Sequence, residues 1–259
     1  MLAPPPRRYG NLRGNGSTAG DPFARIRYDA LSNPQPLTPS PTTLDPSYAE
    51  LAAAVARHGL QLPEDQIAQL QQYCALLWDW NTKINLTRHT DYEKFVSRDL
   101  LDSLTLAQFL ALDETVLDVG TGGGVPGVIL NVVRPDLTVT LSESVGKKAR
   151  VVAEIVERLG LSAAVFHGRA EDALAERRYT SLVIRAVARL TKLLRWFAPH
   201  WSRFDRMLMV KGPSWVEERG EARHYGQFHD LALRKLTSYR IPGNDAESVV
   251  LEIRMKDEG

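Results

Sequence analysis

The feature that most constrains the fold is a glycine-rich turn within residues 115–130, which read TVLDVGTGGGVPGVIL. An apolar run ends in Asp118, breaks into glycines and resumes as a helix-like pattern that starts at Val125-Pro126. Glycine lets the backbone adopt positive φ and approach a ligand closely. A strand, a glycine turn and a helix in this order are typical of α/β proteins that bind a nucleotide-like ligand at the carboxyl edge of a parallel sheet.

The glycines fit two templates. Gly122, Gly124 and Gly127 spell G-x-G-x-x-G, the dinucleotide fingerprint. Gly120, Gly122 and Gly124 spell G-x-G-x-G, with Asp118 two residues before the first of them. Because a glycine fingerprint alone has low specificity, the surrounding residues must decide between the ligands.

Three acids favour a cationic ligand over NAD. Asp118 ends its strand beside the turn, where its carboxylate would repel a pyrophosphate. Glu143 ends the second apolar run, 23 residues after Gly120, where an acid grips a ribose diol. The third run ends in GRAED, which places Glu171 and the Ala170 backbone near an adenine edge. Together they suit S-adenosylmethionine (SAM), although Glu143 or Glu171 taken singly could equally cap a helix or lie in solvent.

The chain after residue 115 predicts a mostly parallel, twisted, Rossmann-like sheet with helices on both faces. Short β-branched or aliphatic runs alternate with helix-like segments. The runs are TVLDV, LTVTLS, AAVFHG, SLVIRA and RMLMVKG, with helices expected near 125–133, 146–159, 170–177, 189–200 and 214–229. The last two runs, LRKLTSYRI and SVVLEIRM, have no helix between them and predict an antiparallel pair at a sheet edge.

Three parts of the chain differ in composition. Residues 1–46 hold nine of the fifteen prolines and few aliphatic residues, so we expect a disordered tail. Residues 47–259 form the predicted ligand-binding domain, with a helical part at 47–112 and the Rossmann-like core at 113–259. In the helical part we expect helices from Asp45-Pro46-Ser47 to Gly59, from Pro63-Glu64-Asp65 to Trp80, near 91–98 and near 99–110.

Composition excludes several classes of protein. No apolar run approaches the ~18 residues of a membrane helix, and the N-terminus lacks the apolar core of a secretory signal. The single cysteine, Cys74, rules out an internal disulfide and is expected to be buried. The six histidines show no metal-ligand spacing, so no metal is expected. We expect a cytoplasmic monomer, and since the net charge is only +1, any nucleic-acid binding must come from a local patch.

Further motifs identify a resemblance. WNTKINLT (80–87), RDLLDSL (98–104), DVGTGGGVPG, SESVGKK, GRAED, IRAVARL and VKG follow in order at familiar spacing. Together they resemble the RsmG/GidB family of bacterial SAM-dependent methyltransferases, which modify N7 of a guanine in small-subunit (16S) ribosomal RNA. The resemblance covers about residues 60–212 well and the C-terminal part more loosely.

The resemblance implies roles for individual residues. Family cofactor contacts correspond to Gly120, Val125, Ala170, Glu171 and Arg185. Gly122 belongs to the same turn, and Glu143 stands where the family usually has aspartate. Because N7 has an in-plane lone pair and no proton, no general base is needed, and positioning and exclusion of water should supply the catalysis.

Arg185 ends the fourth apolar run, and we assign it the catalytic role of donating to guanine O6. The guanidinium could instead pair with the SAM carboxylate or with a neighbouring acid. For the substrate, 16S rRNA or the small subunit, side chains around the predicted cleft supply candidate contacts. They are Asn85, Thr87, Lys147, Lys148 and Lys211, with Arg150, Arg189 and Lys192 also considered. Trp78 and Trp80 could stack on a base, but tryptophan in a helical apolar pattern is more often part of a core.

Departures from the family pattern keep two alternatives open. Asp99 replaces a common histidine, Ile184 replaces a usual serine, and WSRFDRM lacks the usual proline-glycine turn. A non-catalytic RNA-binding or ribosome-binding protein is one alternative. A nicotinamide-dependent oxidoreductase is the other, although no acid–base pair for it is evident.

Overall fold

The structure, a computed structural model, describes residues 45–240 and 247–256. Residues 1–44 lie outside that range, so the prediction of a disordered tail is untested there. Pro46, which the sequence placed in the tail, is the first residue of helix α1 (Pro46–Arg57). The Asp45 carboxylate accepts a hydrogen bond from the Ser47 amide at 3.0 Å, the usual cap of a helix that begins with proline.

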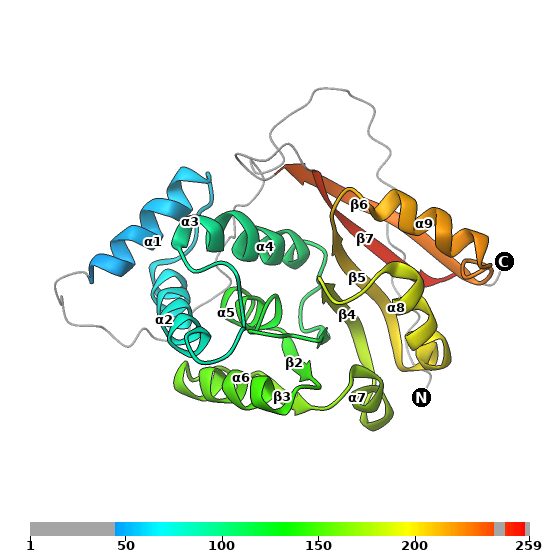
Figure 1. The fold of residues 1–259 in the computed structure, drawn as a ribbon, viewed down its shortest axis with the longest axis horizontal. Coiled ribbons are helices and arrows are strands. Elements are labelled where there is room, and N and C mark those ends of the chain that lie inside the picture. The colour runs from blue at the N-terminus through cyan, green and yellow to red at the C-terminus, as the bar shows by residue number, and fades with distance from the viewer. Residues whose placement is uncertain (1–44, 241–246, 257–259) are drawn as a thin grey trace, which may run out of the picture.

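A seven-stranded sheet forms the centre of the molecule (Figure 1). Its strand order is β3-β2-β1-β4-β5-β7-β6, and β7 is antiparallel to both of its neighbours. The strands are β1 (Thr115–Val119), β2 (Thr138–Glu143), β3 (Ala164–His167), β4 (Tyr179–Arg185), β5 (Phe204–Lys211), β6 (Leu231–Arg240) and β7 (Glu247–Met255). The predicted strands and the antiparallel edge pair are confirmed. Insertion of β7 between β5 and β6 distinguishes this order from the 3-2-1-4-5-6 order of dinucleotide-binding folds.

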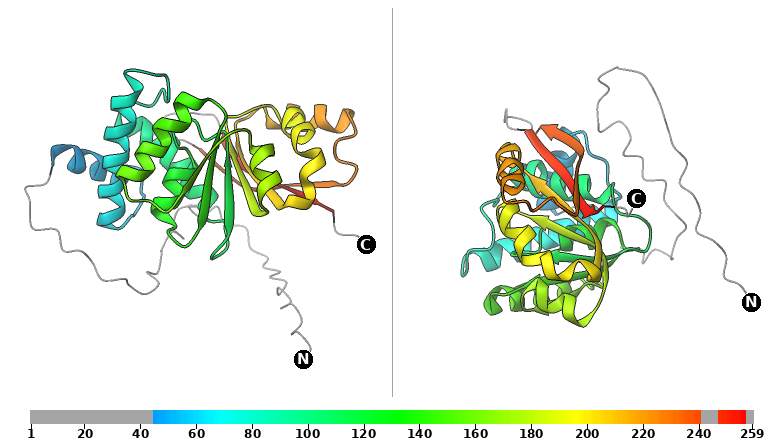
Figure 2. Two further views of the ribbon diagram at one scale, coloured as in Figure 1. Left: turned by 90° about the horizontal axis from the view of Figure 1, so that it is seen from below. Right: turned by 90° about the vertical axis from the view of Figure 1, so that its right-hand side faces the viewer.

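Helices cover both faces of the sheet (Figure 2). Strands buried on both sides read as continuous apolar runs because successive residues point to opposite faces. Val183 on β4, for example, packs into the core beneath α2, α4, α5 and α6, while its neighbours Leu182 and Ile184 pack into the core beneath α7, α8 and α9. The helices are α2 (Glu64–Asn81), α4 (Leu101–Ala107), α5 (Gly127–Val133), α6 (Gly146–Arg158), α7 (Ala170–Glu176), α8 (Leu190–Phe197) and α9 (Trp215–His224).

The prediction of two separate helices at 91–98 and 99–110 is wrong. The structure has one continuous helical run, made of α3 (Tyr92–Lys94), a π-helical stretch (Phe95–Leu100) and α4. The sequence offers no proline or glycine there to interrupt the backbone. π-Helical turns are often found at functional sites, and this one carries Asp99.

The N-terminal helices pack directly on the core domain. The Tyr73 hydroxyl, buried on α2, donates to the Gly123 carbonyl in the glycine turn at 3.0 Å. Cys74 beside it is buried as predicted. The helical part therefore forms one wall of the predicted ligand-binding region.

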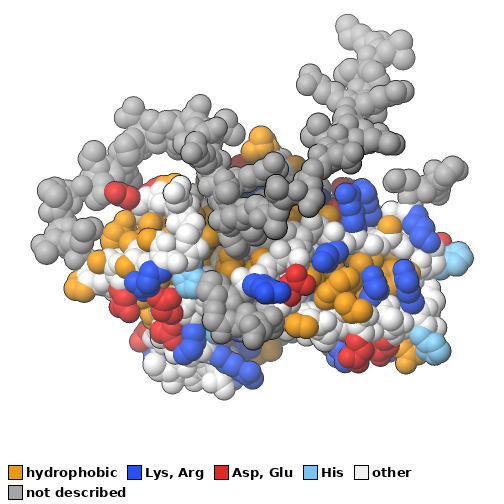
Figure 3. All heavy atoms as spheres, turned by 90° about the horizontal axis from the view of Figure 1, so that it is seen from above, with side chains coloured by type: hydrophobic (Ala, Val, Ile, Leu, Met, Phe, Trp, Pro, Cys, Tyr) orange, Lys and Arg blue, Asp and Glu red, His pale blue; other side chains and the backbone are white. Residues whose placement is uncertain are grey.

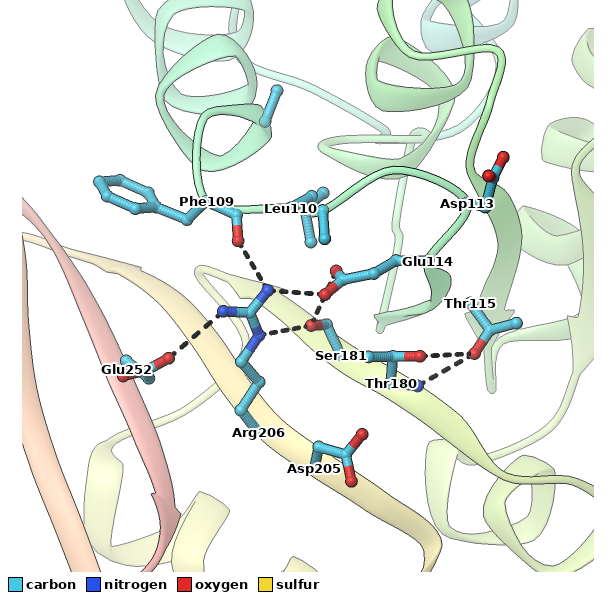
Figure 4. Close-up of polar contacts among 12 residues, drawn as sticks. Phe109, Leu110, Asp113, Glu114, Thr115, Thr180, Ser181, Asp205, Arg206 and Glu252 are labelled. Carbon is cyan, nitrogen blue, oxygen red and sulfur yellow. Dashed lines mark hydrogen bonds and ion pairs between the residues drawn. The ribbon is translucent and has the colours of Figure 1, made fainter. Parts of the chain in front are cut away.

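A second contact between the two parts lies at the amino-terminal ends of the strands (Figure 4). The Arg206 guanidinium on β5 donates to four groups, which lie in the segment between α4 and β1, on β4 and on β7. They are the Phe109 carbonyl (2.6 Å), Glu114 (2.8 Å), the Ser181 hydroxyl (2.9 Å) and Glu252 (3.3 Å). This cluster, the Arg206 clamp, ties the segment after α4 to β4, β5 and β7.

Candidate functional site

The carboxyl ends of β1, β2 and β4 meet at one edge of the sheet. Val119 pairs with Ser142 on β2 and with Ile184 on β4. The next residues along the chain are Gly120, Glu143 and Arg185, three of the predicted site residues. Parallel pairing therefore brings together groups that lie up to 65 residues apart in the sequence.

Positive φ angles shape the turn after β1, at +65° for Gly120, +62° for Gly122 and +107° for Gly124. A side chain at Gly120 would be strained there, and its Cβ would lie 3.3 Å from Val187. Glu143 is 6% exposed and holds the turn in place. It accepts from the Gly122 amide at 3.0 Å and the Val145 amide at 2.8 Å, while its remaining lone pairs can accept from ligand hydroxyls.

Asp118 has a different role from the one predicted. Its side chain is fully buried and accepts a hydrogen bond from the Gly127 amide at 2.9 Å, at the first residue of α5. Burial raises its pKa to about 7. A Cβ at Gly127 would lie 2.6 Å from the carboxylate, so glycine is needed for this close approach. Asp118 fixes the strand to the helix and presents no surface to a ligand.

The predicted adenine-side residues follow β3, on the far side of β2 from β1. Glu143 pairs with His167, and the chain then enters α7 at Ala170. Ala170 is buried and Glu171 is partly exposed. The first N–H groups of a helix have no partner within the helix, so the start of α7 offers donors beside an acceptor side chain.

Arg185 takes part in a network of buried acids, which was one of the alternatives from the sequence. Its Nε donates to Asp102 at 2.7 Å, and its Nη2 lies 2.7 Å from Asp99. His89 Nδ1 contacts the same Asp99 oxygen at 2.8 Å, and the Tyr239 hydroxyl on β6 donates to Asp102. Despite its desolvation, the two carboxylates hold the pKa of Arg185 above its usual value. The guanidinium is thus charged and fixed in orientation.

Asp102 and Tyr239 are the main site residues that the sequence reasoning missed. The motif RDLLDSL places Asp99 and Asp102 three residues apart, on one side of a helix, which was a usable signal for a shared basic partner. Tyr239 gave no such signal, because it reaches Asp102 only through the pairing of the last two strands. Ile184 stands where the family pattern usually has serine. It packs in the apolar core under α8, so the substitution removes a hydroxyl group from a buried position.

The candidate RNA contacts fall into two groups. Asn85 and Lys147 are exposed, while Thr87 and Lys148 are partly exposed. Lys211 is instead engaged within the protein, donating to the Ala188 carbonyl at 2.7 Å and to the buried Glu218 at 2.8 Å. Two other considered residues are also engaged, since Arg189 pairs with Glu217 and Glu221, and the Lys192 ammonium lies over the Trp196 ring.

The two tryptophans of α2 pack within the protein. Trp78 Nε1 donates to the His89 carbonyl at 2.8 Å, and its ring lies against Tyr92. Trp80 contacts Glu154 and the Lys83 ammonium. Both therefore support the helical wall of the site.

Within the described ranges, no three His, Cys, Asp or Glu side chains are placed to hold a metal ion. No helix among the same residues is both long enough and apolar enough to span a bilayer.

The strand order, the glycine turn and the acids at one sheet edge define the class of SAM-dependent methyltransferases with a Rossmann-like fold. Residues 66–244 match the family described as GidB, rRNA small subunit methyltransferase G. The chain belongs to this family, whose methyl donor is SAM.

Two sequence relatives agree with that assignment. Ribosomal RNA small subunit methyltransferase G of Rhodopirellula baltica is 49% identical over 211 residues, which cover 82% of this chain and 89% of the relative. The protein of the same name from Chromobacterium violaceum is 35% identical over 204 residues, 77% of this chain and 93% of the relative. Among solved structures, M. capricolum TrmK in complex with S-adenosylhomocysteine gives a TM-score of 0.47 at 12% identity, covering 60% of this chain and 68% of that chain.

The residues at the edge fit SAM by their chemistry. The turn at Gly120 is a cradle that a Cβ would fill. Asp99 Oδ2 is buried and has no hydrogen-bond partner in the part of the chain that the structure describes, so an ammonium group would supply the missing donor. An acid-lined edge of this kind suits a ligand that carries positive charge.

Proposed function

We propose that this chain transfers the methyl group of SAM to N7 of a guanine in 16S ribosomal RNA, in the cytoplasm and as a monomer. The observation that carries the proposal is the meeting of Gly120, Glu143, the start of α7 and Arg185 at one sheet edge, in a chain of this family. Family membership removes the nicotinamide-dependent alternative.

The cofactor would be held along the ends of three strands. The glycine turn would contact the amino-acid part of the cofactor, and Glu143 would accept hydrogen bonds from its ribose hydroxyls. Ala170 and Glu171 would contact its adenine. When bound, SAM supplies a methyl group already activated by the sulfonium.

The protein then has to orient the base and keep water away from its N7 lone pair. Arg185 can orient the base, because Asp99 and Asp102 fix the plane of its guanidinium. Its Nη1 has no hydrogen bond within residues 45–240 and 247–256, so this nitrogen can donate to the base. A guanidinium held in this way can donate to guanine O6. Asn85, Thr87, Lys147 and Lys148, at the rim of the same edge, are the proposed contacts to the rest of the RNA.

Product analysis tests the proposal. We expect the protein, given SAM and small subunits or their RNA, to make one base in that RNA sensitive to borohydride followed by aniline. The fixed positive charge of an N7-methylated guanine makes the ring prone to reduction and the strand prone to scission. Methylation at a guanine amine or a ribose hydroxyl would refute N7, and SAM binding without transfer to any ribosomal RNA would favour the non-catalytic alternative.

A variant of the turn tests the cofactor site separately. Gly120→Val places a branched side chain at φ +65° against Val187, so we expect calorimetry to detect no SAM binding by a folded protein whose melting temperature is lowered by the strained backbone. Gly160→Val has a similar φ of +62° but open space around its Cβ, far from the proposed site on the loop after α6, and should keep SAM affinity. Equal SAM binding by wild type and Gly120→Val would contradict the assignment.

A further inference from the structure

Helix α9 separates its charges onto two sides. Glu217 and Glu221 pair with Arg189 at 3.2 and 2.9 Å, so these acids are neutralised on the side toward α8. Arg219 and Arg223, also one turn apart, have no carboxylate partner in the described chain and line a different surface. The helix therefore presents a basic side away from the cofactor site.

That basic side forms one wall of a groove of about 550 Å³ between α9 and β6. Phe228, Leu231 and Leu233 contribute its apolar lining, and Lys256 adds a third cation to its rim. Figure 3 shows Lys and Arg side chains gathered around an apolar area over the end of the molecule where α9 and the start of β6 lie. A groove with an apolar floor and basic walls can stack a base and bind the adjacent phosphates.

A second groove, of about 380 Å³, lies on the α4 side of the same strand. Arg234, Lys235 and Arg254 line it, together with Arg206 of the clamp. Its only acid, Glu252, is already paired with Arg206 at 3.3 Å. Arg234 and Lys235 are exposed and have no ion-pair partner among the described residues, so this groove also carries excess positive charge.

These cations follow β6, which is the edge strand of the sheet. Its ten residues span about 33 Å. The strand begins beside the first groove and ends at Tyr239 and Arg240, and Tyr239 donates to Asp102, which binds Arg185. A row of positive charge thus leads from the far end of the molecule toward the proposed site of methyl transfer.

We propose that this basic edge binds the phosphate backbone of the substrate RNA at a distance from the methylated guanine. The inference rests on the proposed function and adds a second contact region to it. Cations on an edge strand also oppose strand-to-strand association, but that role would not require Arg219 and Arg223 on a neighbouring helix. Charge on both sides of the strand, with an apolar floor containing Phe228, fits a nucleic acid better than an acidic protein segment.

Paired substitutions with equal change of charge test the proposal. Arg219→Gln/Arg223→Gln and Arg234→Gln/Lys235→Gln each remove two cations from the edge. The matched control is Arg177→Gln/Arg178→Gln, which removes two exposed arginines just before β4, where they contact the Tyr179 ring and Asp205. All three proteins and the wild type are compared for binding to small-subunit RNA over a series of salt concentrations, for SAM affinity, and for the kcat and KM of methylation.

We expect both edge variants to bind RNA about tenfold more weakly than the control. The slope of log affinity against log salt should fall by about one to two, since each lost phosphate contact removes slightly less than one unit. KM for RNA should rise, while kcat at saturating RNA and the affinity for SAM should stay unchanged.

Other outcomes separate this inference from the proposed function. If the wild type methylates RNA and the edge variants match the control, the basic edge is not an RNA contact and only the inference fails. If the edge variants bind naked RNA normally but assembled subunits weakly, the partner is a ribosomal protein and the RNA assignment is overturned. If the wild type neither binds nor methylates the RNA, the proposed function fails first.

Discussion

A single carboxylate, Asp118, illustrates how burial changes the role of a residue. The carboxyl group has a pKa of about 7 in the folded protein, against 3.8 as a free side chain, because burial penalises its charged form. The folded state therefore keeps a proton that the unfolded state releases. The stability that depends on this proton is fully present below pH ~4 and is lost as the pH rises through about 7.

Asp118→Asn tests this linkage, because the amide keeps the shape and an acceptor for the Gly127 N–H but cannot titrate. We expect the wild type to lose free energy of unfolding, relative to the variant, between about pH 4 and about pH 7 in urea titrations. Parallel pH dependences for the two proteins would mean that Asp118 is already ionised in the folded state.

The residues of the candidate site could be predicted only where the local sequence determines the backbone conformation. Gly120 and Gly122 stand out because their backbone requires glycine, and Glu143 follows from the end of a β-branched run. The burial of Asp118 depends on α5 folding back over it, with Gly127 at its first residue. The contacts of Arg185 join residues more than 80 positions apart, which only the assembled sheet brings together.

At the scale of elements, β6 connects the edge of the sheet to the candidate site. The Tyr239 hydroxyl donates to Asp102, whose pKa is raised by burial but lowered by Arg185 and by this hydrogen bond. Tyr239 therefore acts as a positioning residue: its hydrogen bond favours the ionised form of Asp102, and Asp102 keeps Arg185 in place.

Tyr239→Phe removes that donor while keeping the ring. We expect kcat for methyl transfer to fall by roughly tenfold, as a loss of about 1.4 kcal/mol in positioning would produce. Because the pKa of Asp102 should rise without the donor, the acidic limb of the rate profile should move to higher pH. Tyr225→Phe, at a position that is 65% exposed, is the control. An unchanged acidic limb would reduce Tyr239 to a packing residue.

Most strands and helices could be predicted from the sequence, but the helical run before β1 and the strand order could not. Strands β1, β2, β4 and β5 follow from their apolar runs, because helices cover both faces of the sheet there. The continuous helix through Tyr92–Ala107 was divided in two because its π-helical stretch shifts the apolar spacing and no residue type marks such a stretch. Strand order, by contrast, depends on contacts between residues remote in the chain, such as Met207 and Ile253 of β5 and β7.

At the scale of the whole molecule, the Arg206 clamp joins the helical part to the sheet. Its partners Glu114 and Glu252 are buried, so losing the guanidinium leaves Glu114 without its cation and Glu252 with only the more distant Arg254 Nε at 3.9 Å. We expect Arg206→Ala to lower the free energy of unfolding by about 3–5 kcal/mol. Arg178→Ala, which breaks the exposed pair with Asp205, should cost less than about 1 kcal/mol. Urea denaturation of both variants measures the difference, and equal losses would show that the clamp contributes little.

The position of β7 has a consequence for the order in which the chain can fold during synthesis. β7 leaves the ribosome after β5 and β6, yet it lies between them in the sheet. Until residues 247–255 emerge, β5 keeps an open edge that can pair with another nascent chain, and β6 has no strand to pair with. Tyr239 cannot reach Asp102 before that moment, so the arginine network is completed last. A chain ending at residue 246 should accordingly aggregate on translation, and recovery of a soluble, SAM-binding product from such a chain would show that the sheet closes earlier.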